Sequence, residues 1–282
     1  MVVTLEGGCR VSHMHDGEPL VAGGLRLWRQ VGRATGAQAI SLSVMEFASG
    51  LSPTIQNDAC DQILYLLDNG HSVAESDEVS TTCGSGWLAV IDGESYEVSP
   101  NTGIYVRPNQ TFAINNANVE SVKVISSQCP DPDREPRLIN EPATKSATEF
   151  INASTIVRLA DQKAQPTADR WYRVLIDERV GSTQVTQFVG SIPPGRAPDH
   201  FHNYEEVLFI LKGEGRMWAG ETDTPINAGS CIYLPKGQVH CVENTGAGEL
   251  RLLGVFYPAG SPSVRYDAEG DHAQAIEDGG RV

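Results

Sequence analysis

Positive charge is scarce in this sequence. Lysine and arginine number 21 against 36 aspartates and glutamates, so the formal net charge is −15 at pH 7 with histidine neutral. Binding to a phosphate backbone draws on many Lys and Arg side chains, and so does attraction to anionic lipid. The charge balance therefore argues against nucleic acid and against a membrane surface as partners, and a small molecule is the expected ligand.

Long apolar runs and paired cysteines are also missing. No apolar stretch approaches the ~20 residues of a membrane-spanning helix, and residues 1–20 lack the basic segment and apolar core of a secretory signal. The six cysteines include no Cys-x-x-Cys pair. This pattern predicts free thiols and a cytoplasmic protein, with one disulfide as the alternative.

Turn-forming residues, by contrast, are abundant, with 28 glycines and 16 prolines among 282 residues. Residues 39–47 alternate apolar and polar side chains, as a half-buried strand does. The order of strand, turn, apolar strand, hairpin and proline-ended strand occurs twice, about 140 residues apart, which indicates a duplicated domain. The sequence therefore predicts an all-β chain with two related halves.

Side chains that bind metals gather in the second half. His200 and His202 are two residues apart, so on an extended strand they point to the same face. Glu206 keeps that parity, and a later strand brings in His240. Three imidazoles and a carboxylate are typical ligands of a divalent first-row metal and leave coordination positions for water or substrate.

These residues lie in two motifs that resemble those of the cupin superfamily. The first motif consists of Gly195, His200, His202, Glu206 and Gly213, with the opening glycine slightly closer to the histidines than is usual. The second motif consists of Gly229, Pro235, Gly237, His240 and Asn244. The resemblance implies two cupin barrels in one chain, a bicupin of the double-stranded β-helix or jelly-roll type.

The resemblance also implies the ligand set and the cofactor. His200, His202, Glu206 and His240 are the expected metal ligands. One divalent transition metal per chain is expected, with iron favoured and manganese, zinc, nickel or copper as alternatives. Such proteins are expected to form homo-oligomers, and a dimer is favoured here.

The first copy departs from the motif at each ligand position. Our alignment puts Gln56, Asp58, Gln62 and Ala113 in the places of the four ligands. Alanine has no ligand atom and amides bind transition metals poorly. The first barrel is therefore predicted to be metal-free and structural, either covering a sheet edge of the second barrel or forming a dimer surface. A second, metal-independent pocket is the alternative.

The chain divides at its turn-rich segments. A second His-x-His motif, His13 and His15 followed by Glu18, lacks the apolar strand that follows in the later motif, so a solvated segment is expected there. A short helix within residues 148–151 and a strand within residues 156–159 are expected to dock across the barrels. The expected divisions are an irregular arm (1–24), a degenerate barrel (25–128), a linker (129–169), a metal-binding barrel (170–260) and a flexible tail (261–282).

No catalytic acid or base is evident, but inward-facing positions suggest pocket residues. Residues alternate between the inside and the outside of a barrel. Arg216 is of interest because a buried Arg would bind a carboxylate or carbonyl, whereas the alternative places it in solvent. The candidate pocket residues are Gln187, Arg216, Trp218 and Tyr233.

Three functions compete at this stage. The favoured one is a non-haem Fe(II) dioxygenase acting on a small, metal-chelating organic substrate. The apolar strand after Glu206 suggests a dry pocket, and oxygen chemistry needs an additional acid or base less than an isomerase does. The first alternative is a non-redox isomerase, lyase or decarboxylase that uses the metal as a Lewis acid. The second alternative is small-molecule binding without catalysis.

Overall fold

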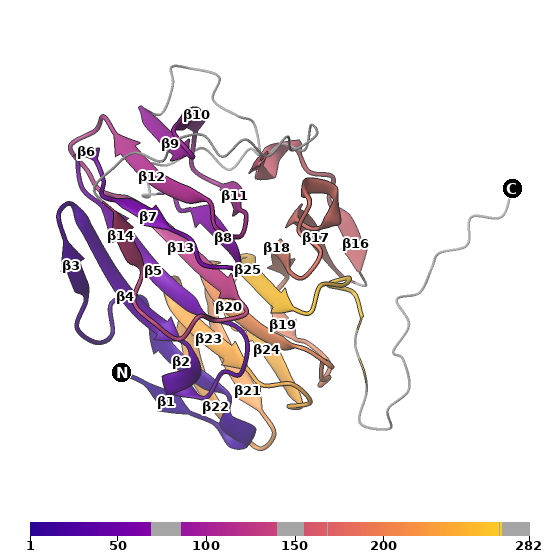
Figure 1. Ribbon diagram of the computed structural model, residues 1–282. Helices are drawn as coiled ribbons and strands as arrows, with labels where there is room; N and C mark the ends of the chain where they lie inside the picture. The colour runs from indigo at the N-terminus through magenta and orange to yellow at the C-terminus, as the bar shows by residue number, and fades with distance from the viewer. Residues whose placement is uncertain (69–85, 140–154, 168, 265, 267–282) are drawn as a thin grey trace, which may run out of the picture.

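The computed structural model describes residues 1–68, 86–139, 155–167, 169–264 and 266. Four antiparallel sheets form two barrels that lie against each other (Figure 1). The predicted fold class, all-β with two barrels, is confirmed. Short 3-10 turns complete the regular structure: η1 (Glu6–Gly8), η2 (Arg33–Thr35), η3 (Leu159–Asp161) and η4 (Glu178–Val180).

In the first barrel, a seven-stranded sheet lies opposite a six-stranded sheet. The larger sheet runs β15 (Ile156–Arg158), β11 (Thr102–Val106), β8 (Asp61–Leu66), β13 (Val122–Cys129), β5 (Leu42–Phe47), β4 (Leu25–Val31) and β3 (Leu20–Ala22). The smaller sheet runs β10 (Glu94–Val98), β9 (Trp87–Ile91), β12 (Thr111–Asn116), β7 (Thr54–Gln56) and β14 (Arg137–Ile139), with β6 (Gly50–Leu51) also paired to β12.

The second barrel has the same plan with an eight-stranded and a four-stranded sheet. The larger sheet runs β1 (Val3–Thr4), β2 (Arg10–His13), β23 (Ser230–Leu234), β20 (Glu205–Lys212), β25 (Leu250–Tyr257), β18 (Thr186–Ile192), β17 (Arg170–Ile176) and β16 (Gln165–Thr167). The smaller sheet runs β19 (Gly195–Arg196), β24 (His240–Asn244), β21 (Glu214–Ala219) and β22 (Thr222–Asn227).

The two large sheets pack face to face, which explains the wholly apolar strands. On β20, Leu208 and Ile210 point into the second barrel, whereas Val207 and Phe209 belong to the core between the barrels. Strand β8 of the first barrel alternates in the same way between its own interior and this shared core. Because both faces of such a strand are buried, its sequence is apolar throughout and does not alternate with polar residues as a half-exposed strand does. The apolar run after Glu206 therefore reflects barrel–barrel packing as well as the interior of the second barrel, so the run by itself does not indicate a dry pocket.

Each barrel receives an edge strand from the segment that precedes the other. Strand β2 precedes the first barrel in sequence, yet it pairs with β23 of the second, with Val11 opposite Ile232. Strand β15 precedes the second barrel but pairs with β11 of the first, with Val157 opposite Gly103. The strand expected within residues 156–159 is thus confirmed, whereas the helix expected within residues 148–151 lies outside the described residues. The first barrel covers a face of the second barrel's large sheet, whereas β2 covers its edge, so the predicted edge-covering role was wrong.

The segments outside the barrels are more regular than expected. Residues 1–24, predicted to be an irregular arm, contain β1, β2 and β3. The predicted linker, 129–169, contributes β14, β15 and β16 to the sheets. Of the predicted tail, 261–264 and 266 are described, and Tyr266 bridges to Phe201 beside the second barrel; 265 and 267–282 lie outside the described residues.

Two equivalent acid–tyrosine contacts join the barrels. The Tyr105 hydroxyl donates to Asp61 at 2.6 Å in the first barrel, and the Tyr233 hydroxyl donates to Glu205 in the second. Glu205 also accepts the backbone N–H groups of residues 38 and 39 from the first barrel, each at 2.7 Å. Burial raises the pKa of both tyrosines, and their carboxylate partners raise it further. Both hydroxyls therefore stay protonated and act as donors.

The described cysteines are free thiols, as expected. Cys9, Cys60, Cys129, Cys231 and Cys241 are all buried and unpaired with one another; Cys83 lies outside the described residues. Within the described part of the chain, no helix is long and apolar enough to cross a membrane.

Candidate metal centre

Three histidines come together at one end of the second barrel. His200 and His202 lie in the segment between β19 and β20, and His240 opens β24. His200 and His240 form a β-bridge, with N–O distances of 3.1 and 2.8 Å between their backbones. One ring nitrogen from each histidine lies within 4.8 Å of the others. The two-residue spacing thus places His200 and His202 together, as predicted.

Backbone carbonyls fix the tautomer of all three rings. A carbonyl oxygen only accepts, so each Nδ1 that contacts one must carry the proton, and the lone pair of the neutral ring lies on Nε2. This arrangement, with Nδ1–H held by the protein, is typical of metal-binding histidines. The carbonyls are those of Pro198, Val264 and Gln238, at 2.9, 3.1 and 2.8 Å from His200, His202 and His240 respectively.

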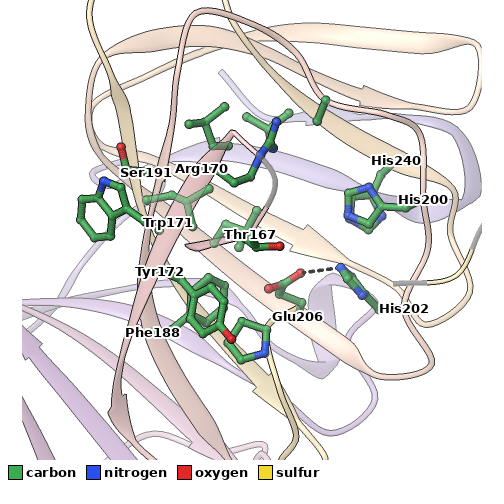
Figure 2. A pocket seen from close by; sticks show the side chains of 17 residues that line it. Thr167, Arg170, Trp171, Tyr172, Phe188, Ser191, His200, His202, Glu206 and His240 are labelled. Atoms are coloured by element: carbon green, nitrogen blue, oxygen red, sulfur yellow. Dashed lines mark ion pairs between the residues drawn. The ribbon is translucent and has the colours of Figure 1, made fainter. Parts of the chain in front are cut away.

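Glu206 lies beside His202 and adjoins the three histidines, although it is not part of the group whose ligand atoms all lie within 4.8 Å of one another. It lies on β20, is 4% exposed, and has Oε2 at 3.7 Å from Nε2 of His202 (Figure 2). Converging imidazole lone pairs beside a buried carboxylate are costly without a cation between them. Three nitrogens and one oxygen are also the donor set that first-row divalent metals accept. The residues present therefore fit a metal ion.

The site opens into a cavity of about 90 Å³. At about 10–15 Å³ for each water centre, this volume holds several waters or one small organic molecule. Figure 2 shows the histidines on one side, with Thr167, Tyr172 and Phe188 on another. Apart from the histidines and Glu206, the lining consists of Thr167, Arg170, Trp171, Tyr172, Phe188, Gly190, Ser191, Ile192, Ala197, Leu208, Val242, Leu252 and Pro262.

None of the four pocket candidates from the sequence lines this cavity. Met217 points into the barrel, so its neighbours Arg216 and Trp218 point outward. Arg216 forms an ion pair with Asp223, and the Trp218 indole donates to Glu243 at 2.8 Å. The alternative reading of Arg216, that it points to solvent, was the better one.

The other two candidates face the first barrel. Gln187 is 1% exposed, and its Oε1 approaches the backbone of Gly103 in β11. Tyr233 binds Glu205 in the core between the barrels. Alternation along a strand says which residues share a face, but it does not say whether that face is the inside of a barrel or the contact with a second one.

Sequence reasoning missed Arg170, the cavity's one described cationic side chain apart from the histidines. It opens β17, a strand on which the sequence suggested no pocket residue. Arg170 shares a face with Tyr172 and Val174, both of which belong to the interior of the second barrel. The alternation along this strand was therefore the signal that could have placed Arg170 in the cavity.

The first barrel carries other side chains at the equivalent positions. Its β7 residue Ile55 pairs with Phe112, as His200 pairs with His240, so the aligned positions Gln56 and Ala113 were each wrong by one residue. Gln62 pairs with Gln128 on β13, as Glu206 pairs with Phe256 on β25, which supports its assignment. Isoleucine and phenylalanine supply no ligand atom, and the cavity here is only about 10 Å³.

The N-terminal histidines and Asp58 of the first barrel have partners of their own and take no part in the metal site. His15 binds Glu46 at 2.8 Å and packs on Trp28, and neither it nor His13 belongs to the described histidine cluster. Asp58, aligned with His202, accepts from Nε of Arg134 at 3.0 Å. The carboxylate is thus engaged by an arginine at the mouth of the first barrel.

Comparisons with known proteins agree with this architecture. The cupin domain family matches residues 188–256. The chain is 35% identical over 83 residues to auxin-binding protein 1 of Arabidopsis thaliana, covering 26% of this chain and 42% of that protein. It is 39% identical over 67 residues to an oxalate-binding protein of Thermotoga maritima, covering 23% and 55%. The matches thus span about half the length of these curated relatives.

Similarity to solved structures extends over most of the chain. A Lactobacillus farciminis oxalate decarboxylase in complex with formate superposes with a TM-score of 0.68 at 12% identity, covering 89% of this chain and 87% of that one. A variant of Bacillus subtilis oxalate decarboxylase gives 0.66 at 13%, covering 89% and 77%. Identity this low shows the fold alone. The family match places a cupin domain in the second barrel, and the two barrels give the whole chain the fold of a bicupin.

Proposed function

We propose that the second barrel holds one divalent transition metal on His200, His202, His240 and Glu206 and acts on a small organic acid by non-redox chemistry, foremost decarboxylation. The observation that carries the proposal is the convergence of three Nε2 lone pairs beside a buried carboxylate. The metal identity is left to experiment, because ligand type alone selects poorly among first-row ions.

The protein's own groups define what can occur at this site. The carbonyls on each Nδ1 hold the imidazoles in place, so the ligand nitrogens need no rearrangement on binding. Apolar side chains such as Leu208, Val242 and Leu252 limit the water around a bound acid. A metal held here supplies Lewis acidity, polarising a carboxylate or carbonyl oxygen of the substrate.

The side chains of the cavity favour decarboxylation over isomerisation. Among its described lining residues, the ionisable groups beyond the four proposed ligands are Arg170 and Tyr172. An isomerase requires a base to remove a proton from carbon. Loss of CO₂ needs an electron sink and then a proton, which water can supply. The likeness to oxalate decarboxylases and to an oxalate-binding protein supports the same class of substrate.

The dioxygenase expected from the sequence has less support. That expectation rested on the apolar strand after Glu206, and half of that strand faces the first barrel. Its other argument, the lack of an additional base, applies equally to decarboxylation. The dioxygenase is therefore retained as an outcome of the test below.

Metal analysis tests the site. Purified protein is expected to contain about one metal per chain, measured by mass spectrometry, in keeping with a single four-ligand site. His202→Ala should lose this metal, while His13→Ala, which alters the unrelated N-terminal motif, should keep it. Metal-free wild-type protein after loading with Fe, Mn, Zn, Ni or Cu would remove the basis of the proposal.

A reaction screen tests the chemistry. Metal-loaded protein is incubated with oxalate and with 2-oxo and 3-oxo acids, and released CO₂ and consumed O₂ are measured together. CO₂ released without net consumption of O₂, and lost in His202→Ala, supports decarboxylation. Consumption of O₂ in proportion to product, with nitric oxide binding to the iron form, would replace the proposal with the dioxygenase.

A further inference from the structure

Arg170 gives the cavity a second point of recognition, on a different wall from the metal ligands. We infer that Arg170 binds a carboxylate of the substrate, so that the preferred ligand is a small dicarboxylate with one acid group at the metal and the other at this guanidinium. The inference rests on the proposed function and narrows its substrate class. The histidines and Arg170 line one cavity of about 90 Å³, which limits the ligand to a short diacid.

The burial of Arg170 supports this role. The Arg170 side chain is 10% exposed. Its Nε donates a hydrogen bond of 2.9 Å to Asp169, and the Asp169 side chain is itself 63% exposed. Within the described part of the chain, no hydrogen bond is made by the two terminal nitrogens, Nη1 and Nη2. The side chain is largely buried but its two terminal nitrogens keep contact with solvent, so a carboxylate can replace water there. The two parallel N–H groups of that edge match the two oxygens of a carboxylate.

The first barrel shows that the fold does not require this arginine. Strands β4 and β17 each carry a bulge, ending at Val31 and Ile176 respectively. Leu25 and Arg170 each lie six residues before the end of this bulge, so they occupy equivalent positions in the two barrels. Leu25 is 0% exposed in the core of the first barrel, so an apolar side chain fits this position structurally. Arginine in the second barrel therefore indicates a ligand.

Charge and space point to the same ligand. The chain carries −15 overall, so a cation facing this cavity differs from the general background. With a divalent metal, Glu206, Arg170 and its partner Asp169, the site keeps a net positive charge, which favours an anionic ligand. Gly190 occupies the position that Met45 has in the first barrel. Gly190 pairs with Tyr172, the third residue of β17, as Met45 pairs with Leu27, the third residue of β4. The glycine therefore leaves space that the methionine fills in the first barrel.

Calorimetric titration of the metal-loaded protein tests the inference. The probes are oxalate, malonate and succinate, with acetate and propionate as monocarboxylate comparators. The variants are Arg170→Leu, which installs the residue of the first barrel, and Arg170→Lys, which keeps the charge. Arg216→Leu is the matched control, because it removes an arginine from the outer face of the same barrel. Metal content and thermal midpoint are measured for each protein.

We expect the best dicarboxylate to bind wild type more tightly than either monocarboxylate, and to weaken on the order of 10- to 100-fold in Arg170→Leu. Monocarboxylate binding and metal content should change little, Arg170→Lys should restore part of the affinity, and Arg216→Leu should match wild type. Equal dicarboxylate binding by wild type and Arg170→Leu, or an equal loss in Arg216→Leu, overturns the inference alone. Failure of wild type to bind any metal overturns the proposed function as well.

Discussion

The two barrels share one topology but differ in what fills them. Where the second barrel has His240, Gly190 and Arg170, the first has Phe112, Met45 and Leu25. Those three first-barrel residues are at most 2% exposed, and the cavity there is about 10 Å³ instead of 90 Å³. A few side chains thus convert a packed core into a cavity that carries metal-binding and charged groups, without altering the strand order around it.

The comparison also assigns a role to the filled barrel. A barrel with a cavity in its interior gives up some of the packing that stabilises a core. The second barrel packs one whole sheet against the first, so residues such as Val207 and Val255 are buried outside its own interior. We conclude that the first barrel contributes stability at the back of the sheet whose front supports the proposed site.

The largest expected effect on stability comes from substituting Phe112 of the first barrel, and the matched change is at the equivalent residue of the second barrel, His240. Phe112→Ala should cost about 3–5 kcal/mol of unfolding free energy, since it leaves a void in a filled core, and should not change metal content. His240→Ala should abolish metal binding but cost only about 1 kcal/mol in chelator, mainly from the hydrogen bond to Gln238. Urea unfolding in EDTA measures both. Equal costs would mean that His240 is a packing residue.

The next largest effect concerns the paired tyrosines. Tyr105→Phe leaves Asp61 with one long contact, 3.4 Å from Gln184, and should cost about 1.5–3 kcal/mol. Tyr233→Phe leaves Glu205 with two backbone donors at 2.7 Å and should cost about 1 kcal/mol. Urea midpoints of the two variants give the order, and the reverse order would show that the two contacts do not differ as their partners suggest.

A third test fills the open barrel with the side chain of the closed one. The Cβ of a residue at 190 would make ordinary 3.5 Å contacts with Leu252 and Phe188, so Gly190→Met is expected to fold. The added side chain should occupy the cavity and weaken binding of a small acid by about tenfold or more, with metal content unchanged. Calorimetry on metal-loaded protein measures the change. Unaltered acid binding would place the acid elsewhere.

The smallest effect is expected at the mouth of the first barrel. Arg134 is 59% exposed in its ion pair with Asp58, and exposed pairs contribute little. Arg134→Ala should therefore change the unfolding free energy by less than about 1 kcal/mol, with no change in metal content. A loss several times larger in urea unfolding would show that this ion pair, and not the packing of residues 132–136, closes the first barrel.

The fold and the metal cluster were accessible from sequence because both depend on local pattern. The spacing of His200 and His202 fixes their relation through strand geometry alone. The duplicated order of strands and turns predicted two related halves, and the resemblance of the motifs implied that each half is a barrel. These signals survive errors of one or two residues at strand ends.

The remaining lining of the cavity depends on contacts distant in sequence. The alternation along their strands suggested that Gln187 and Tyr233 point into the second barrel, yet both face the first barrel. Only the packing of the two large sheets against each other determines this orientation. The one-residue error at Phe112 has a related cause, because register is set by pairing with β7 and β9. Strand β2 was missed because its partner, β23, lies near the other end of the chain.

The exchange of edge strands has a consequence for synthesis. Translation proceeds from the N-terminus, so β2 (Arg10–His13) emerges long before β23 (Ser230–Leu234), its partner. The first barrel likewise emerges with the outer edge of β11 uncovered until β15 (Ile156–Arg158) follows. Bare sheet edges invite pairing with other chains, and pairings so distant in sequence form slowly. The nascent chain is therefore most exposed to mispairing while half made, and neither half carries all the strands of its own barrel.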